Sequence, residues 1–362
     1  MGVVNSYLSL TKPKVVILLQ ITALCSVLSH DLIGESEIGA ETIKTIFIVF
    51  VGGYLTAGGA NAVNMWYDRD IDPNMTRTSN RSLPTGEIDA NSALLFGISI
   101  SIIGTVWFSL LANNVAAFWA LFSVLFYVFI YTMWLKRRTP QNIVIGGIAG
   151  STPPVIGWAA AEEGLSIEIT SFQVFFESIF NLGPHAYLGS YPIMPWFMFL
   201  LIFLWTPPHF WALALYRSNE YEKVGVPMMP NVKGKSRTLI EMKIYSILLI
   251  ILSLVTFLTY TAEIKWSIFE SFNQEKILVT LTAFILSVWY ATTVWNIDVF
   301  EEADESGRMS IASRSFFVSL LYLALMFMVL VTGSFGFEGT LIGLLVVSIS
   351  IYSSEMRNKN RI

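Results

Sequence analysis

The sequence predicts an all-α integral membrane protein with about nine transmembrane helices in a bundle. Of its 362 residues, 54% are hydrophobic and only 13% are charged, whereas soluble domains average about 25% charged residues. The mean hydropathy is +0.61. A spanning helix needs roughly 20 apolar residues, so this hydrophobic share supplies about nine of them. A water-soluble globule is excluded, because its surface needs more charge than this chain carries.

Long apolar runs with few charges mark the individual helices. Runs long enough to span a membrane lie at 15–33, 43–66, 92–112, 115–135, 142–161, 193–215, 239–260, 277–297 and 315–333. A tenth run at 339–352 is short for a span, and it either crosses the bilayer or lies in the interface. We therefore expect one intramembrane domain over 1–362, with a C-terminal hydrophobic segment and basic tail at 335–362.

Charge in the loops predicts the orientation. Alternate loops on one side hold most of the basic residues, namely Lys12, Lys14, Arg69, Arg77, Arg81, Lys136, Arg137, Arg138, Arg217, Lys223, Lys233, Lys235, Arg237, Arg308 and Arg314. The opposite loops hold only Lys44, Lys265 and Lys276. We therefore expect a multi-pass protein of the cell (inner) membrane, with the N-terminus in the cytoplasm. The long outer loop 162–191 contains phenylalanines near helical spacing, which predicts an interfacial amphipathic helix.

Composition also excludes several kinds of site. A single cysteine, Cys25, excludes an intramolecular disulfide and any metal cage built from cysteines. The formal net charge of −4 gives no basic face for nucleic acid.

An acidic stripe ends the second predicted span. Asn64, Asp68 and Asp72 follow one another at intervals of four residues, so on a helix they share one face, while Asp70 points elsewhere. Pro73 should end the helix at Asp72. Three oxygen donors one turn apart suit Mg²⁺, which completes its shell with water and phosphate oxygens. The alternative is a solvated acidic and basic loop that caps the helix.

Basic residues surround this stripe and a second polar cluster. Arg77, Arg81 and Lys136 are candidates to bind a diphosphate, as are Arg217 and Lys233 beside Glu220 at the end of the sixth span. Four spans separate the two clusters, so both lie on the cytoplasmic side. This arrangement predicts two parallel four-helix units around a central cavity.

The first motif resembles that of the UbiA superfamily of intramembrane aromatic prenyltransferases, an Asn-x-x-x-Asp-x-x-x-Asp string. Further strings are similar to the branch of that superfamily that farnesylates heme, and they extend over nearly the whole chain. They are Leu10-Thr-Lys-Pro13, Leu83-Pro-Thr-Gly86, Gly146-Gly-Ile-Ala-Gly150, Trp205-Thr-Pro-Pro208-His209 and Gly225-Val-Pro-Met-Met-Pro230. One departure is that Glu220 stands where the family usually has Asp.

The resemblance implies a fold, a reaction and its ligands. Nine helices would enclose an apolar cavity, and farnesyl diphosphate would prenylate a vinyl group of heme b, with water ending as a hydroxyl. The implied metal is Mg²⁺, and the implied catalytic ligands are Asn64, Asp68, Asp72 and Glu220. A heme A synthase or a terminal oxidase assembly is expected as a partner by association only.

His209 is the only histidine inside a predicted span. By the resemblance it would bind heme, by ligating iron, orienting the porphyrin or moving a proton. The alternative is a hydrogen bond to a carbonyl freed by Pro207 or Pro208.

Other cavity-wall candidates have equally ordinary explanations. Trp66, Tyr67, Trp205 and Trp211 offer π faces for an allylic cation, but they could simply pack. The glycines from Gly146 to Gly157 either let a flat substrate approach the backbone or sit at helix crossings.

Two other functions compete with heme farnesylation. One is prenylation of a quinone precursor or another aromatic acceptor, against which the Pro-Pro-His string counts. The other is a membrane transporter, since carriers also hold intramembrane carboxylates. Carriers place such charges near the midplane, whereas the acids here lie at helix ends on one side.

Overall fold

The computed structural model describes residues 2–34, 38–75, 78–183, 192–216, 225–260, 273–301 and 309–359. Within these ranges the chain is helical and has no strand. The helices are α1 (Val3–Leu10), α2 (Pro13–Ile33), α3 (Ala40–Tyr67), α4 (Ala90–Leu111), α5 (Asn114–Leu125), α6 (Asn142–Ser151), α7 (Pro153–Ala161), α8 (Phe172–Phe180), α9 (Ile193–Tyr216), α11 (Met229–Lys233), α12 (Lys235–Leu254), α13 (Gln274–Trp295), α14 (Ser310–Gly333) and α15 (Gly336–Lys359). A π-helical segment, η3 (Phe126–Leu135), continues α5, and three 3₁₀ turns are η1 (Asp68–Asp70), η2 (Asp72–Asn74) and η5 (Thr256–Tyr260).

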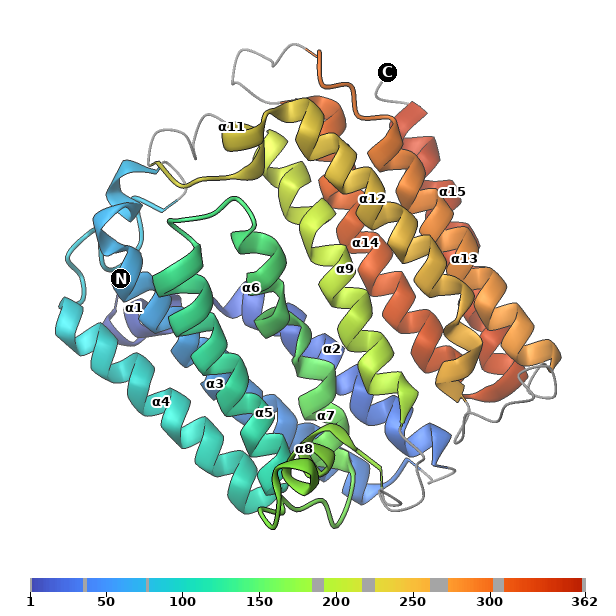
Figure 1. Ribbon diagram of the computed structural model, residues 1–362, viewed down its shortest axis with the longest axis horizontal. Coiled ribbons are helices and arrows are strands. Elements are labelled where there is room, and N and C mark those ends of the chain that lie inside the picture. Colours follow the sequence, from blue (N-terminus) through green and yellow to red (C-terminus); the bar gives the residue numbers. More distant parts are fainter. Residues whose placement is uncertain are drawn as a thin grey trace.

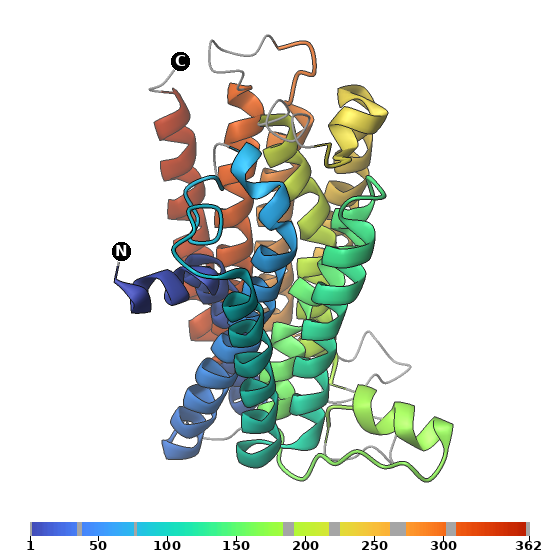
Figure 2. The same cartoon turned by 90° about the vertical axis from the view of Figure 1, so that its left-hand side faces the viewer.

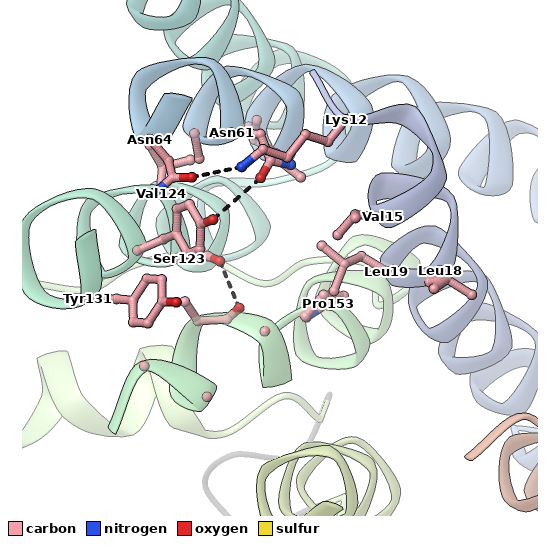
Figure 3. Close-up of a pocket in the computed structure, with 18 of the residues that line it drawn as sticks. Lys12, Val15, Leu18, Leu19, Asn61, Asn64, Ser123, Val124, Tyr131 and Pro153 are labelled. Carbon is pink, nitrogen blue, oxygen red and sulfur yellow. Dashed lines mark hydrogen bonds between the residues drawn. The ribbon is translucent and has the colours of Figure 1, made fainter. Parts of the chain in front are cut away.

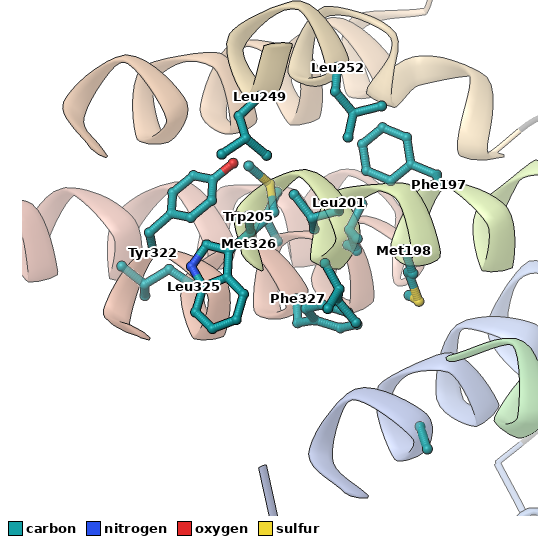
Figure 4. Packing of buried hydrophobic residues seen from close by; sticks show 14 of the residues in the cluster. Phe197, Met198, Leu201, Trp205, Leu249, Leu252, Tyr322, Leu325, Met326 and Phe327 are labelled. Atoms are coloured by element: carbon teal, nitrogen blue, oxygen red, sulfur yellow. The ribbon is translucent and has the colours of Figure 1, made fainter. Parts of the chain in front are cut away.

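The long helices form two groups that pack side by side (Figure 1). One group is α2 to α7 and the other is α9 to α15, and α2 contacts α3, α7, α9 and α14. Buried side chains such as Leu201, Leu249 and Met326 join α9, α12 and α14 (Figure 4). Figure 2 shows α1 lying across the bundle and α8 at the end opposite the C-terminus. In the described part of the chain the first group holds five candidate spans and the second group holds four, so the arrangement as two parallel four-helix units stays a prediction.

Nine helices in the described part of the chain are long and apolar enough to cross a membrane. The number of candidate spans agrees with the prediction, but the segments that supply them differ. The run at 339–352 belongs to a full-length candidate span, Gly336–Asn358. The predicted span 239–260 is instead α12, which ends at Leu254 and carries Lys235, Arg237, Glu241 and Lys243 in its first half. Because of these charges, α12 is not among the candidate spans. The protein is a multi-pass membrane protein.

The predicted amphipathic helix in the outer loop is α8. The Ser171 side chain caps its N-terminus by accepting the Val174 amide at 3.2 Å, which is a usual way to satisfy a free N–H. Phe172 and Phe176 are exposed, while Phe180 stacks against Trp196 at 5.5 Å between ring centroids. The part of the loop at 184–191 lies outside the described residues.

Close backbone contact with α4 holds the end of α3 that carries the acidic motif. A Cβ at Gly59 would lie 2.6 Å from the Gly97 carbonyl oxygen, and one at Gly97 would lie 3.0 Å from the Gly59 oxygen. Only glycine fits at both positions, and small residues are the usual means of such approach in membranes. The polar residues that follow Gly59 on α3 are thereby fixed relative to α4.

The π-helical segment η3 faces the end of α3. Its wider turn is closed by the Lys136 amide, which donates to the Tyr131 carbonyl five residues earlier at 2.8 Å. The Tyr127 and Tyr131 rings stack with centroids 5.3 Å apart. Residues four and five apart therefore share a face here, and π segments of this kind occur often at functional sites.

Candidate active site

The acidic motif begins on α3 and continues into two 3₁₀ turns. We expected α-helix as far as Asp72, and this was wrong, because α-helical geometry ends at Tyr67. The Ile71 amide then bonds the Asp68 carbonyl at 3.0 Å, and the Met75 amide bonds the Asp72 carbonyl at 3.3 Å. The two 3₁₀ turns continue in the direction of α3. Asp68 and Asp72 therefore still follow Asn64, although the α-helix has ended.

Asn64, Asp68 and Asp72 are nearly inaccessible, with 3%, 1% and 3% of their surface exposed. Asn64 Nδ2 donates to Asp68 Oδ2 at 3.0 Å and to Thr132 Oγ1 at 3.1 Å. Because buried charges are costly unless they are paired, partners for these carboxylates are required.

Each buried carboxylate has basic partners from another part of the chain. Lys136 Nζ pairs with Asp68 Oδ2, and Arg137 Nη2 lies 3.4 Å from Asp68 Oδ1. Arg81 Nη1 lies 2.8 Å from Asp72 Oδ2. The structure thus gathers two predicted diphosphate-binding residues, Arg81 and Lys136, around the predicted metal ligands.

Asp70 points away from this cluster, as expected. It is exposed and accepts two hydrogen bonds of 2.7 Å from Arg137, whose guanidinium lies 4.8 Å from the Tyr67 ring centroid.

Lys12 completes the cluster, and sequence reasoning missed its role. Its Nζ donates to Asn64 Oδ1 at 2.7 Å. Burial, followed by repulsion from Arg81 and Lys136, lowers the pKa of Lys12 to about 7, because both disfavour the ammonium. Among the described residues other than glycine, Lys12 alone has a positive φ, of 50°. Such a backbone costs about 1–3 kcal/mol and is often found at functional sites.

A cavity of about 420 Å³ lies beneath the cluster (Figure 3). Its polar end is lined by Lys12, Asn64, Asp72, Arg81 and Lys136. Its remaining wall is mostly apolar or aromatic and includes Val15, Leu18, Gln20, Phe108, Tyr127, Tyr131, Gly150, Ile156 and Trp205. Val15 and Leu18 are 49% and 55% exposed, so the cavity reaches the surface of the bundle beside α2.

The oxygen donors present fit a magnesium ion. Among the described residues, no group of three or more His, Cys, Asp or Glu side chains is placed to hold a metal. The donors are two carboxylates, Asp68 and Asp72, with the Asn64 amide oxygen. Mg²⁺ commonly takes one or two protein carboxylates and completes its octahedron with waters and phosphate oxygens.

The structure does not bring every predicted residue to this site. Arg77, Arg217 and Glu220 lie outside the described residues. Lys233 is exposed at the end of α11 and does not line the cavity.

His209 lies behind the cavity wall rather than on it. Its ring stacks between Trp205 and Phe316, at centroid distances of 4.2 and 4.7 Å. Its Nδ1 lies 2.6 Å from Ser319 Oγ, and that hydroxyl donates its hydrogen to the Phe316 carbonyl at 2.6 Å. When the Ser319 hydroxyl donates to the Phe316 carbonyl, His209 Nδ1 is the nitrogen that donates to Ser319.

The four predicted aromatics have different positions, and Tyr67 lies under the Arg137 guanidinium. Trp205 lines the cavity and donates to the Ser319 carbonyl at 2.8 Å. Trp211 is fully buried and does not line the cavity, and Trp66 lies under the Arg69 guanidinium. Tyr127 and Tyr131 line the cavity and were not singled out, because their spacing of four residues does not show which face of a predicted span meets a cavity.

Comparison with known proteins identifies the family. The model of the UbiA prenyltransferase family matches residues 34–271. The chain belongs to the UbiA prenyltransferase family. This UbiA prenyltransferase is 38% identical over 342 residues to a protoheme IX farnesyltransferase of Parvibaculum lavamentivorans, covering 94% of the chain and 92% of that relative. It is 37% identical over 327 residues to the protoheme IX farnesyltransferase of Bartonella henselae, covering 90% and 89%.

Solved structures confirm the fold of this UbiA prenyltransferase. A digeranylgeranylglyceryl phosphate synthase has a TM-score of 0.63 at 18% identity, covering 92% of the chain and 99% of that protein. A UbiA homolog from Archaeoglobus fulgidus bound to DMAPP and Mg²⁺ has a TM-score of 0.55 at 16% identity, covering 90% and 99%. The predicted all-helical UbiA-type architecture is thus confirmed, and the protein is a membrane prenyltransferase.

Proposed function

We propose that this prenyltransferase transfers a farnesyl group from farnesyl diphosphate to a vinyl group of heme b, and that it requires Mg²⁺. The observation that carries the proposal is the cluster of oxygen donors and cations at one end of an apolar cavity that reaches the surface of the bundle. A diphosphate suits the polar end, and an isoprenoid and a porphyrin suit the apolar wall. The names of the relatives support the choice of substrates.

The charged residues have two tasks in this reaction. Asn64, Asp68 and Asp72 would hold Mg²⁺, with Glu220 as a further proposed ligand. Bound there, the ion would neutralise charge on the departing diphosphate. Cations that now pair with the carboxylates, such as Lys136, would then be free to bind the diphosphate, and Arg77, Arg217 and Lys233 are proposed to join them.

The apolar part of the cavity protects the allylic cation. Its wall offers the aromatic faces of Tyr127, Tyr131 and Trp205, which attract positive charge without reacting with it. Exclusion of bulk water prevents simple hydrolysis of farnesyl diphosphate.

The acceptor is proposed to enter from the bilayer at the half-exposed Val15 and Leu18. His209 is proposed to orient the heme through Trp205, against which it stacks. We further propose that the acidic end faces the cytoplasm of an inner membrane, where the soluble diphosphate arrives, and that a heme A synthase or a terminal oxidase assembly receives the product.

The test is direct. Membranes that contain the full-length protein, incubated with farnesyl diphosphate, Mg²⁺ and heme b, should yield a more hydrophobic heme on reversed-phase chromatography. Chelation of Mg²⁺ should stop its formation. Prenylation of a quinone precursor with no change in heme would overturn the proposed acceptor.

A further inference from the structure

Two polar side chains from different helices meet on the cavity wall below the carboxylates. The Tyr127 hydroxyl of η3 donates to Asn61 Oδ1 of α3 over 3.4 Å, and both residues line the cavity. Asn61 Nδ2 donates to the Thr11 carbonyl at 3.2 Å, which fixes the amide. Figure 3 shows Asn61 beside Asn64 on this wall. Asn61 is only 6% exposed, so the pair belongs to the interior.

The pair lies at the depth where a prenyl group would react. Asn61 precedes Asn64 by three residues on α3, which places it about 4.5 Å further along the helix axis toward the apolar part of the cavity. In the proposed function, the diphosphate binds at the level of Asn64 and Asp72. The first carbon of the farnesyl chain is bonded to that diphosphate. It therefore lies deeper in the cavity than the diphosphate, beside Asn61.

Asn61 and Tyr127 can accept hydrogen bonds from a molecule in the cavity. An amide oxygen has two lone pairs, and Asn61 Oδ1 receives one recorded bond. The Tyr127 hydroxyl gives its hydrogen to that oxygen and keeps its own lone pairs. Their separation of 3.4 Å is long for a hydroxyl bond, whose usual length is about 2.7–2.8 Å. A water molecule can therefore donate one hydrogen to each.

We propose that Asn61 and Tyr127 position the water molecule that ends the reaction, an inference that rests on the proposed function. When the carbon–oxygen bond of farnesyl diphosphate breaks, its electron pair leaves with the diphosphate. The vinyl π electrons form the new carbon–carbon bond from the terminal vinyl carbon, which leaves the positive charge on the carbon attached to the porphyrin. The water oxygen bonds that carbon, and its surplus proton passes to the departed diphosphate.

Hydrogen bonds from both hydrogens of the water to Asn61 and Tyr127 fix the orientation of the water in this step. A water whose hydrogens point to Asn61 and Tyr127 turns its lone pairs toward the cation. Without that water, the same cation can lose a proton to the diphosphate and become an alkene. The two products differ by one water, so the pair controls which product forms.

The test uses the variants Tyr127→Phe and Asn61→Leu in the full-length protein in membranes. They are supplied with farnesyl diphosphate, Mg²⁺, heme b and ¹⁸O-labelled water, and products are resolved by mass spectrometry. The ratio of labelled alcohol to alkene should fall about tenfold in each variant, which corresponds to one lost hydrogen bond. Tyr127→Phe keeps the aromatic ring, so a loss of cation stabilisation alone would not change the ratio.

Tyr54→Phe is the matched control. The Tyr54 hydroxyl also lies in this region, 2.8 Å from Thr11 Oγ1. Among the described residues, however, Tyr54 is not one of those that line the cavity. Its product ratio should equal that of the wild type. An unchanged ratio in both Tyr127→Phe and Asn61→Leu, even with lower turnover, would overturn the inference. Failure of the proposed function is distinguishable, because the wild type would then form neither product.

Discussion

Lys12 Nζ donates a hydrogen bond of 2.7 Å to Asn64 Oδ1, the amide oxygen that we propose as a metal ligand. An ammonium and a divalent cation bound to the same oxygen destabilise each other, because like charges repel at short range. If metal and substrate bind as proposed, Lys12 would turn from Asn64 toward the diphosphate. Its backbone, with a φ of 50°, holds Lys12 beside Asn64 at the polar end of the cavity.

Replacement of Lys12 by Met tests this exchange. Met keeps an unbranched side chain that is one atom shorter, and it removes the charge. Loss of one charge-assisted hydrogen bond to the diphosphate should raise the KM for farnesyl diphosphate about 10- to 100-fold. The concentration of Mg²⁺ needed for half-maximal activity should not rise, because no ammonium then competes for Asn64. A higher Mg²⁺ requirement with an unchanged KM would contradict the exchange.

The pH dependence of stability gives a second test on the metal-free protein. The pKa of Lys12 is lowered from 10.5 to about 7 in the folded protein, so between these values the unfolded chain binds the extra proton. Stability therefore rises with pH through this window, and the full cost of the buried ammonium is present below pH 7. Thermal unfolding in EDTA from about pH 7 to about pH 9 should show this rise in the wild type and a smaller one in Lys12→Met. Parallel curves would show that Lys12 does not titrate there.

Asp68 and Asp70 form a natural matched pair of carboxylates. Asp68 is buried against Asn64 and Lys136, whereas Asp70 is exposed and pairs with Arg137. Asp68→Asn should lower turnover by at least about 100-fold, because it removes a buried carboxylate that we propose as a metal ligand. Asp70→Asn should change turnover by less than about threefold, as is usual for exposed ion pairs. Equal effects in initial-rate measurements would refute the metal assignment.

The sequence sufficed for the gross architecture because apolar length is a strong signal in membranes. The spacing also predicted that Asn64, Asp68 and Asp72 lie together, and the structure buries all three in one polar cluster, although the assumed α-helix gives way to 3₁₀ turns after Tyr67. The predicted span 239–260 corresponds to α12, whose charged first half places it outside the described helices that are apolar enough to count as candidate spans.

Other site residues could not be found in this way because their roles depend on tertiary structure. In the sequence, Lys12 cannot be told from other loop cations. Its contact with Asn64 arises only when α2 packs against α3. Tyr127 and Tyr131 are four residues apart and share a face on any helix, but only the packing of η3 against α3 turns that face to the cavity. His209 was predicted beside the substrate because it lies in an apolar span, yet stacking on Trp205 places it one layer behind.

His209→Ala should lower heme turnover while leaving binding of farnesyl diphosphate largely unchanged. The imidazole supports Trp205 on the acceptor side and contacts none of the charged cluster. We expect a loss of about 10-fold in turnover, from truncation of a buried ring contact. Ser319→Ala, which removes only the partner of Nδ1, should have a smaller effect in the same direction. Equilibrium binding of farnesyl diphosphate provides the check, and its loss together with turnover would indicate a general structural role.

The glycines of α6 can be separated by substitution. A Cβ at Gly146 would collide with the Tyr131 ring, whereas a Cβ at Gly150 would meet nothing within 4 Å. Gly146→Ala should therefore destabilise the protein by about 1–3 kcal/mol through overpacking, and Gly150→Ala should be neutral or stabilising by up to about 1 kcal/mol. Gly150→Leu should fold normally but lower turnover, because its side chain enters the cavity. Thermal unfolding and initial rates distinguish these effects, and wild-type turnover in Gly150→Leu would mean that neither substrate uses this part of the wall.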